Sequence, residues 1–598
     1  MVGLLKRMAV LFQKEDRLNF ILLFIGILLN SGMEVLGIGL IVPFISLLAH
    51  PEMLETNHHL NRVYHFFPFH SFLDFMIVLA VFIVVVFVVK NVIVMVMTFF
   101  QTKFIFGKRA VLATRLFRAY MLSPYSFHLK RNLGQFQQKI GAVDGVMLNG
   151  VLNIIYMLTE GLLVLCLLAV LFRTNFMMTL AAMTVLAGGL LMYFYFLQDR
   201  IQSWGEKNNL HNALYWQQLN QGLGSIKESK LLGKEMFFVD RFYHHMTQMT
   251  RQQCKSDVVA KSPKLFIEVI VVGLVMSAMA ICLLAGQAPG SIFVTISLFA
   301  IVSVRLMPSL NKISGSWASF KFFLPSFEAI YDDLVACEKI EGQLRARTTG
   351  APLSLTKEIR LEDVSFSYEN APGLALDHVS LTIPRNGLVG FIGPSGAGKT
   401  TVVDMILGLL DPSGGKILVD GVDIHTHLRS WQTVIGYIPQ TIYLCDDTIR
   451  NNVAFGLAAA EISDEQVWRS LRLAQLDEFV RSLPEGLNTT VGERGVRLSG
   501  GQRQRLGIAR TLYHDPQVLV MDEATAALDN ETERSFMEAL LGLSGERTII
   551  IIAHRLTTVQ QCDKIFFLKD GRLVSEGRFE ELSVSCPEFR KMVGREKF

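Results

Sequence analysis

The chain has 598 residues, and a typical domain size of roughly 100 to 200 residues predicts two to four domains. Its 51% hydrophobic and 18% charged residues, with a mean hydropathy of +0.37, exclude a disordered chain, a collagenous repeat and an ordinary soluble enzyme. Lysine and arginine number 57 against 53 aspartates and glutamates, so no global basic field favours a nucleic acid partner. The seven scattered cysteines show no CxxC spacing, which argues against a disulfide framework and a zinc site.

Apolar runs long enough to cross a hydrocarbon core of about 30 Å recur six times in the first half of the chain. The first run carries Glu34 and Pro43 and is too long for a cleaved signal peptide. The sequence therefore predicts an α-helical membrane domain with six transmembrane helices. The runs cover residues 18–49, 72–100, 147–172, 176–197, 265–285 and 291–308.

The distribution of basic residues predicts the orientation of these helices. Residues 101–146 contain many lysines and arginines against Asp144 alone, and residues 199–264 are also rich in them. Because cytoplasmic loops carry an excess of positive charge, we expect both segments in the cytoplasm, each continuing as a helical hairpin. The connections at 50–71 and 286–290 then face outward.

The outward loop after the first span has a helical pattern of its own. Leu60, Val63, Tyr64 and Phe67 recur at i, i+3, i+4 and i+7, which places them on one helix face. Such a helix either lies at the membrane surface or packs as a cap on its own spans, and both interpretations stay open.

The apolar runs stop after Cys337, and a charged linker leads to a second domain. Short β-rich stretches there alternate with helical ones, which predicts an α/β fold with a buried, largely parallel sheet. These stretches are residues 359–366, 387–392, 518–521 and 548–552. We expect a cytoplasmic N-terminal segment over 1–17, the transmembrane domain over 18–338, the linker over 339–354 and the second domain over 355–598.

A glycine-rich segment follows the second of these strands and precedes a helical stretch. It reads Gly393-Pro394-Ser395-Gly396-Ala397-Gly398-Lys399-Thr400, a P-loop in the strand and helix context that this motif requires. Its glycines let backbone N–H groups surround phosphate oxygens, Lys399 reaches the β- and γ-phosphates, and the Thr400 hydroxyl is a ligand for Mg²⁺.

A second motif supplies carboxylates. The apolar strand 518–521 ends in Asp522 and Glu523, so that Asp522 can join the Mg²⁺ shell while Glu523 polarises an attacking water. The two motifs together indicate nucleotide hydrolysis.

Between these motifs, residues 498–502 read LSGGQ, and with them the second domain resembles the ATP-binding cassette (ABC) family over its whole length. The resemblance implies an α/β P-loop nucleotide-binding domain that hydrolyses ATP with Mg²⁺. It includes Tyr368 as the aromatic that stacks on adenine, Gln440 as the Q-loop, residues 492–494 as the X-loop, residues 527–529 as the D-loop and His554 as the γ-phosphate sensor.

The same resemblance assigns the individual site residues. It implies Glu523, His554 and Gln440 as catalytic residues, and Thr400, Gln440 and Asp522 as Mg²⁺ ligands. The residues implied to bind ATP are Tyr368, Gly393, Pro394, Ser395, Gly396, Ala397, Gly398, Lys399, Thr400, Thr401, Ser499, Gly500, Gly501, Gln502 and Asp529.

Six spans and one cassette match half of an exporter of this family. By the resemblance, Ser499 and Gly501 bind the ATP held by the opposite subunit's P-loop, so that two cassettes close face to face. A homodimer of twelve spans is the most economical complete form, and a heterodimer stays open. The cytoplasmic hairpins are expected to act as coupling helices that press on the cassettes near Gln440.

The membrane half resembles the bacterial PglK-type flippases for lipid-linked oligosaccharides. The similar stretches are residues 34–47 (EVLGIGLIVPFISL), residues 305–309 (RLMPS) with Asn311 and Lys312, and residues 437–444 (YIPQTIYL). The resemblance implies that an undecaprenyl-pyrophosphate-linked glycan moves from the inner to the outer leaflet of a bacterial inner membrane, in support of glycosylation.

Four cations are candidate substrate residues. At a rise of about 1.5 Å per residue, Lys90, Lys264, Arg305 and Lys312 lie roughly 20 to 30 Å below the outer helix ends, toward the inner leaflet. A basic ring at that depth could hold a pyrophosphate. The alternative is snorkelling to headgroups or a position on cytosolic helix extensions. Pairing of the cations with Glu34, Glu160 or Glu268 is left open.

Other functions share parts of this pattern. An exporter of another lipid, a peptide or a drug would keep the ATPase motifs without needing the basic ring. An ATP-gated channel would share the fold, but channels of this superfamily tend to have a degenerate site, whereas Glu523 and His554 are both present. A soluble cassette protein is excluded by the six spans. The sequence does not determine the glycan.

Overall fold

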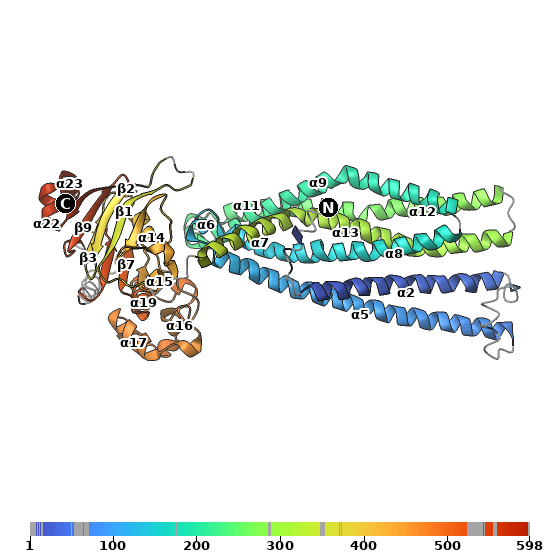
Figure 1. Ribbon diagram of the computed structural model, residues 1–598, viewed down its shortest axis with the longest axis horizontal. Helices are drawn as coiled ribbons and strands as arrows, with labels where there is room; N and C mark the ends of the chain where they lie inside the picture. The colour runs from blue at the N-terminus through green and yellow to red at the C-terminus, as the bar shows by residue number, and fades with distance from the viewer. Residues whose placement is uncertain are drawn as a thin grey trace. The chain divides into compact units, whose positions relative to one another are not determined.

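The computed structural model describes residues 7–8, 10, 12, 16–49, 51–52, 64, 71–174, 176–284, 289–346, 353–369, 371, 373–522, 542, 545–553 and 559–595. The chain divides into two compact units, Met1–Ser123 with His128–Lys339 and Pro124–Phe127 with Ile340–Phe598. The first unit is helical and the second contains β-sheets and helices (Figure 1). This confirms the predicted fold class of a helical membrane domain and an α/β nucleotide-binding domain.

Long apolar helices form the first unit. They are α2 (Arg17–Ala49), α5 (Phe72–Met121), α8 (Leu152–Thr174), α9 (Phe176–Gly224), α12 (Pro263–Leu284) and α13 (Pro289–Ala346). The predicted spans lie on these helices, and the third begins in the preceding π-helical segment η2 (Val146–Val151). Among the described residues, four stretches are long and apolar enough to cross a membrane: Arg17–Ile41, Phe72–Met121, Leu133–Arg173 and Thr179–Gly224.

The membrane stretches carry apolar side chains on their outer surface. On α5, Val84 is 62% exposed and Met95 is 76% exposed, and large apolar side chains of α2 and α9 are exposed in the same way. So much apolar surface would be unfavourable in water but is favourable against lipid tails. The helix backbone meanwhile satisfies its own hydrogen bonds, which hydrocarbon requires.

The two basic segments between spans are helical, as predicted. At 50 residues α5 is about 75 Å long, well over the hydrocarbon thickness, so it continues beyond the membrane. The first segment also contains α6 (Tyr125–Leu129) and α7 (Leu133–Gly145). The second contains the end of α9, α10 (Ile226–Leu232) and α11 (Glu235–Lys261), which packs along α9.

Two expectations for loops fall partly or wholly outside the described residues. Of the predicted outward helix, only Tyr64 is described, and its ring packs edge-on against Phe75 at 5.4 Å. The charged linker was expected to begin at residue 339, and α13 continues through Ala346. Residues 347–352 lie outside the described part of the chain.

A six-stranded sheet organises the second unit. Its order is β10-β9-β3-β8-β7-β6, and the neighbours from β9 to β6 pair in parallel, while β10 is antiparallel. The strands are β3 (Leu388–Ile392), β6 (Ile435–Ile438), β7 (Val518–Asp522), β8 (Thr548–Ile552), β9 (Lys564–Lys569) and β10 (Arg572–Gly577). The predicted buried, largely parallel sheet is therefore present.

A smaller antiparallel sheet lies in the same unit, in the order β2-β1-β4-β5. Its strands are β1 (Glu358–Phe366), β2 (Leu376–Pro384), β4 (Gly414–Val419) and β5 (Val422–Asp423). Among the described residues of this unit, the α-helices are α14 (Lys399–Ile406), α15 (Leu428–Thr433), α16 (Ile449–Val453), α17 (Asp464–Leu473), α18 (Asp477–Ser482), α19 (Gly500–Tyr513), α22 (Phe579–Ser585) and α23 (Pro587–Arg595).

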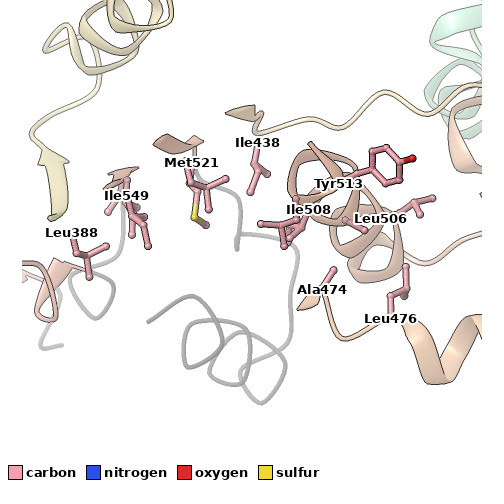
Figure 2. Close-up of a cluster of buried hydrophobic side chains, with 14 of the residues drawn as sticks. Leu388, Ile438, Ala474, Leu476, Leu506, Ile508, Tyr513, Met521 and Ile549 are labelled. Carbon is pink, nitrogen blue, oxygen red and sulfur yellow. The ribbon is translucent and has the colours of Figure 1, made fainter. Parts of the chain in front are cut away.

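The parallel sheet is buried on both faces, so its strands are almost uniformly apolar. On one face, residues of β3, β7 and β8 form a cluster with Leu506 and Ile508 of α19 (Figure 2). On the other face, Phe391 stacks on Phe566 and the buried Trp431 donates its indole N–H to the Ile406 carbonyl. This packing holds the carboxyl ends of β3 and β7 in place, where the site residues begin.

Candidate functional site

The P-loop connects β3 to α14, as the sequence predicts. Gly398 has φ +95°, and a Cβ there would lie 2.8 Å from the Ala375 carbonyl oxygen. A Cβ on Gly393 would collide with the Leu568 carbonyl oxygen. Glycine is therefore needed at both positions, and the loop can bring its N–H groups close around an anion at the start of α14.

Lys399 holds the loop together from inside. Its side chain is buried, and its Nζ donates to the carbonyl oxygens of Gly393 at 2.8 Å and Pro394 at 3.0 Å. Pro394, Ser395 and Gly396 are exposed, so the rim of the loop is open to a ligand. The ammonium group thus lies at the centre of an accessible cradle of backbone groups, where it could contact phosphate oxygens.

The first turn of α14 continues this site. Thr400 is exposed, whereas Thr401 is buried, and its hydroxyl lies 3.2 Å from the Tyr368 hydroxyl. The Tyr368 ring packs edge-on against Phe366 at 4.9 Å. The structure therefore brings the predicted adenine-stacking residue beside the P-loop, with a partly exposed ring.

Two carboxyl groups lie together next to the loop. Asp522 ends β7 and is buried, and Asp404 of α14 is half-buried. Burial, and then the charge of Asp522, raises the pKa of Asp404 to about 6. The Tyr437 hydroxyl hydrogen-bonds to Asp522, and burial together with the two carboxylates raises its pKa. A cation near these carboxylates would relieve their mutual repulsion.

These side chains fit the Mg²⁺ that the family resemblance implies. A hydroxyl at Thr400 and a carboxylate at Asp522 are hard oxygen donors of the kind that Mg²⁺ prefers, next to a loop suited to phosphates. Gln440, the third predicted ligand, is exposed just after β6. Bound there, Mg²⁺ would neutralise charge on the phosphate oxygens.

The LSGGQ segment forms the N-terminus of α19. The Ser499 hydroxyl accepts from the Gln502 N–H at 3.2 Å, and the Gln502 side chain accepts from the Ser499 N–H at 2.8 Å. This reciprocal capping box fixes the first turn, while Ser499 stays exposed and Gly500 and Gly501 add no side chain. The turn places backbone N–H groups at the surface of the unit, as an anion-binding helix start does.

The membrane unit contains a charged cavity of about 320 Å³. Residues of α2, α5, α8 and α13 line it: Asn30, Glu34, Val94, Met97, Thr98, Gln101, Tyr156, Thr159, Glu160, Arg305, Pro308 and Lys312. Polar and ionised groups inside apolar helices are costly, which makes such a cavity a candidate binding site.

Ion pairs organise this cavity. Glu34 contacts two cations, Lys90 Nζ at 3.0 Å through Oε2 and Arg305 Nη2 at 3.1 Å through Oε1. Glu160 lies 3.3 Å from Lys312 Nζ and accepts a hydrogen bond from the Ser309 hydroxyl at 2.8 Å. The pairings that the sequence left open are thereby resolved for Glu34 and Glu160.

Only three of the four predicted substrate cations come together. Arg305 and Lys312 line the cavity, and Lys90 is joined to it through its ion pair with Glu34. Lys264 is exposed at the start of α12 and is not among the described residues that line the cavity. Depth along a helix can be read from sequence, whereas the direction of a side chain around the helix depends on packing.

Residues 376–526 match the family described as ABC transporter. An ATP-dependent lipid A-core flippase of Cupriavidus metallidurans is 33% identical over 463 residues, which cover 76% of each protein. This chain belongs to the ABC transporter family. The flippase of the same name in Mannheimia succiniciproducens is 30% identical over 478 residues, covering 78% of this transporter and 79% of the relative.

Two further similarities differ in extent. The heterocyst differentiation ATP-binding protein HepA of Nostoc sp. is 35% identical over 364 residues, but the match spans only 60% of the transporter and 58% of that relative. A bacterial Atm1-family ABC exporter with ATP bound superposes with a TM-score of 0.81 over 98% of the transporter and 99% of that chain, at 23% identity. The structural similarity shows that the transporter has the ABC exporter fold, and membership of the family makes it an ATPase coupled to transport.

Some predicted site residues of the transporter lie outside the described residues. These are Glu523, Asp529 and His554. The structure also adds two residues that the sequence did not suggest, Asp404 and Tyr437, both beside Asp522. A signal for Asp404 was present, because it lies four residues after Thr400 and so on the same face of α14.

Proposed function

We propose that the transporter uses ATP hydrolysis to flip a polyprenyl-pyrophosphate-linked oligosaccharide from the inner to the outer leaflet of a bacterial inner membrane. The observation that carries this proposal is the cavity between apolar helices that Arg305 and Lys312 line, with Lys90 paired to its lining residue Glu34. Two curated relatives are named lipid A-core flippases, which supports a lipid-linked cargo.

The physical chemistry of such a cargo matches a charged cavity. Each unpaired glycan hydroxyl costs several kcal/mol in an alkane-like medium, and an ionised pyrophosphate costs far more. A polar cavity lowers both costs, while the polyprenyl tail remains among lipid tails. Arg305 suits the headgroup because a guanidinium can donate two parallel hydrogen bonds to phosphate oxygens.

We assign the ATP site accordingly. Tyr368 stacks on adenine, residues 393–401 bind the phosphates, and Thr400, Gln440 and Asp522 hold Mg²⁺. Glu523 polarises the attacking water, and His554 contacts the γ-phosphate. In this proposal the transporter is a homodimer, residues 499–502 and Asp529 contact the nucleotide of the opposite subunit, and the nucleotide-binding domains lie in the cytoplasm.

Replacing Arg305 tests the substrate class. Arg305→Ala should reduce flipping of a fluorescent polyprenyl-pyrophosphate glycan in proteoliposomes by roughly 10- to 100-fold, because a charge-assisted hydrogen bond contributes roughly 1.5–3 kcal/mol. Basal ATPase should stay near wild type, since no residue of the ATP site changes. Arg305→Lys should recover part of the loss.

Lys264→Ala is the matched control, since it removes an exposed cation outside the cavity and should leave flipping unchanged. Unchanged flipping in Arg305→Ala would contradict an anionic headgroup at this cavity. Stimulation of the ATPase by another lipid or a drug, with none by polyprenyl-pyrophosphate glycans, would favour a different exporter function.

A further inference from the structure

Glu34 occupies a particular place among the charges of the cavity. It is 6% exposed and bridges two cations that come from different helices, Lys90 of α5 and Arg305 of α13. Its two carboxylate oxygens divide between them, Oε2 toward Lys90 and Oε1 toward Arg305. The guanidinium proposed to receive the substrate anion is thus already paired with an anion of the protein itself.

The two cations depend on Glu34 to different degrees. Lys90 is 7% exposed, and its ammonium group also lies 4.5 Å from the centre of the Phe87 ring. The side chain of Arg305 is 31% exposed, and in the part of the chain that the structure describes its buried Nε has no hydrogen-bond acceptor. Arg305 is therefore partly exposed and keeps unused donor capacity beside the cavity, whereas the buried ammonium group of Lys90 is held by Glu34 and the Phe87 ring.

Glu160 differs from Glu34 although it lines the same cavity. It accepts from the neutral Ser309 hydroxyl at 2.8 Å and lies 3.3 Å from Lys312, whose ammonium group also lies over the Tyr156 ring. Neither of these contacts of Glu160 is with Arg305. The two carboxylates and three cations leave one net positive charge, and of these two carboxylates it is Glu34 that contacts the guanidinium.

We propose that Glu34 is the resident counter-ion of this cavity, which the phosphate groups of an anionic lipid headgroup must displace from Arg305. This inference rests on the function proposed above. On displacement, Glu34 keeps its contact with Lys90 through Oε2, so no buried carboxylate is left unpaired. Arg305 then directs its N–H groups, including the unsatisfied Nε, to phosphate oxygens.

A resident carboxylate also sets how strongly an anion must bind to Arg305 before it can occupy the cavity. A small monoanion gains little by replacing a carboxylate that is already in place, whereas a pyrophosphate brings more charge and more acceptor oxygens. The empty cavity keeps all but one of its positive charges compensated, which limits the cost of cations among apolar helices during the return of the empty transporter. Selectivity then comes from competition rather than from a site that is simply basic.

Removing the charge of Glu34 tests this competition. The full-length transporter in nanodiscs is titrated with undecaprenyl pyrophosphate, and the half-saturating concentration for ATPase stimulation is measured. Glu34→Gln should lower it roughly three- to tenfold, because a competing charge pair at Arg305 is removed while an amide oxygen still accepts from Lys90. Inorganic pyrophosphate should also compete more strongly with the lipid in this variant.

Glu160→Gln is the matched control, because it removes a carboxylate from the same cavity without touching Arg305. A double-mutant cycle separates a local from a general electrostatic effect. The decrease in half-saturating concentration caused by Glu34→Gln should disappear when Arg305 is also replaced by alanine. Any change in this concentration caused by Glu160→Gln should persist in the Arg305→Ala background. The proposal would be overturned if Glu34→Gln and Glu160→Gln lowered the half-saturating concentration equally, whether or not Arg305 was present.

The outcomes separate this inference from the proposed function. If Arg305→Ala leaves the half-saturating concentration unchanged, the anionic substrate at this cavity is wrong. If Arg305→Ala raises the half-saturating concentration but Glu34→Gln does not lower it, only the counter-ion role of Glu34 is wrong. If Glu34→Gln fails to assemble, Glu34→Asp can replace it, because this variant keeps the charge on a shorter side chain that reaches Arg305 less well. Glu34→Asp should still lower the half-saturating concentration, and an unchanged value would overturn the inference.

Discussion

Asp404 lies one turn beyond Thr400 on α14 and experiences the charge of Asp522 at the end of β7. Its pKa of about 6 is above the ordinary value for aspartate because burial disfavours the carboxylate and Asp522 repels it. The folded state therefore holds this proton up to a higher pH than the unfolded chain does. Stability contributed by the protonated form is lost as pH rises from about 4 to about 6.

Asp404→Asn should remove this loss of folding stability at higher pH. The neutral amide has the same shape, so the nucleotide-free, Mg²⁺-free variant should be more stable than wild type at pH 7.5 by about 1 kcal/mol, after allowance for partial exposure. At pH 3 the difference should be small, since wild-type Asp404 is then largely protonated in both states. Thermal unfolding of both proteins across this pH range measures it, and a difference independent of pH would contradict the assigned repulsion.

At the scale of elements, a glycine of α9 lies in close contact with α13. A Cβ added to Gly205 of α9 would fall well inside contact distance of the Phe322 carbonyl oxygen of α13. Phe322, Ile201 and Ala318 form a buried cluster around this point. Because backbone rather than a flexible side chain lies opposite, the two helices must separate to admit even a methyl group.

Gly205→Ala should therefore destabilise the packing of α9 on α13 by about 1–3 kcal/mol, although alanine has the higher helix propensity. Gly141→Ala on α7 is the control, because a Cβ there meets no atom within 4 Å and the gain in propensity should leave stability equal or slightly higher. Thermal unfolding in detergent compares the two variants. Similar melting temperatures for both would show that α9 and α13 do not meet this closely.

At the scale of the whole molecule, the proposed dimer makes each ATP site composite. Ser499 is exposed at the N-terminus of α19, whereas Lys399 lies inside the P-loop of the same unit. In the proposed arrangement, one subunit supplies the P-loop and the other supplies the LSGGQ turn. Two subunits that carry different substitutions can then place both substitutions in the same ATP site or one in each site.

Mixing Ser499→Arg subunits with Lys399→Ala subunits should separate these cases. One composite site then carries both defects and the other carries neither, so purified heterodimers should retain up to about half of the wild-type ATPase, while each mutant homodimer is inactive. Two different affinity tags isolate the heterodimer. Heterodimer activity no higher than that of either homodimer would refute shared sites.

The sequence by itself determined the features that depend on neighbouring residues. A strand, glycine loop and helix follow one another directly at residues 388–406, so the P-loop conformation is a local property that the motif predicts. The apolar helices are predicted for a similar reason, because the length of an apolar run sets whether a helix can cross the membrane. The buried parallel sheet is indicated by its short, continuously apolar strands.

Only the tertiary structure decided which distant side chains meet. Glu34 contacts Lys90 across 56 residues and Arg305 across 271, and Lys264 at a similar predicted depth lies outside the cavity. Asp404 and Tyr437 likewise reach Asp522 from other elements. Hydropathy gives the depth of a residue along its helix, but its direction around the helix follows from how the helices pack, and that depends on contacts spread over the whole unit.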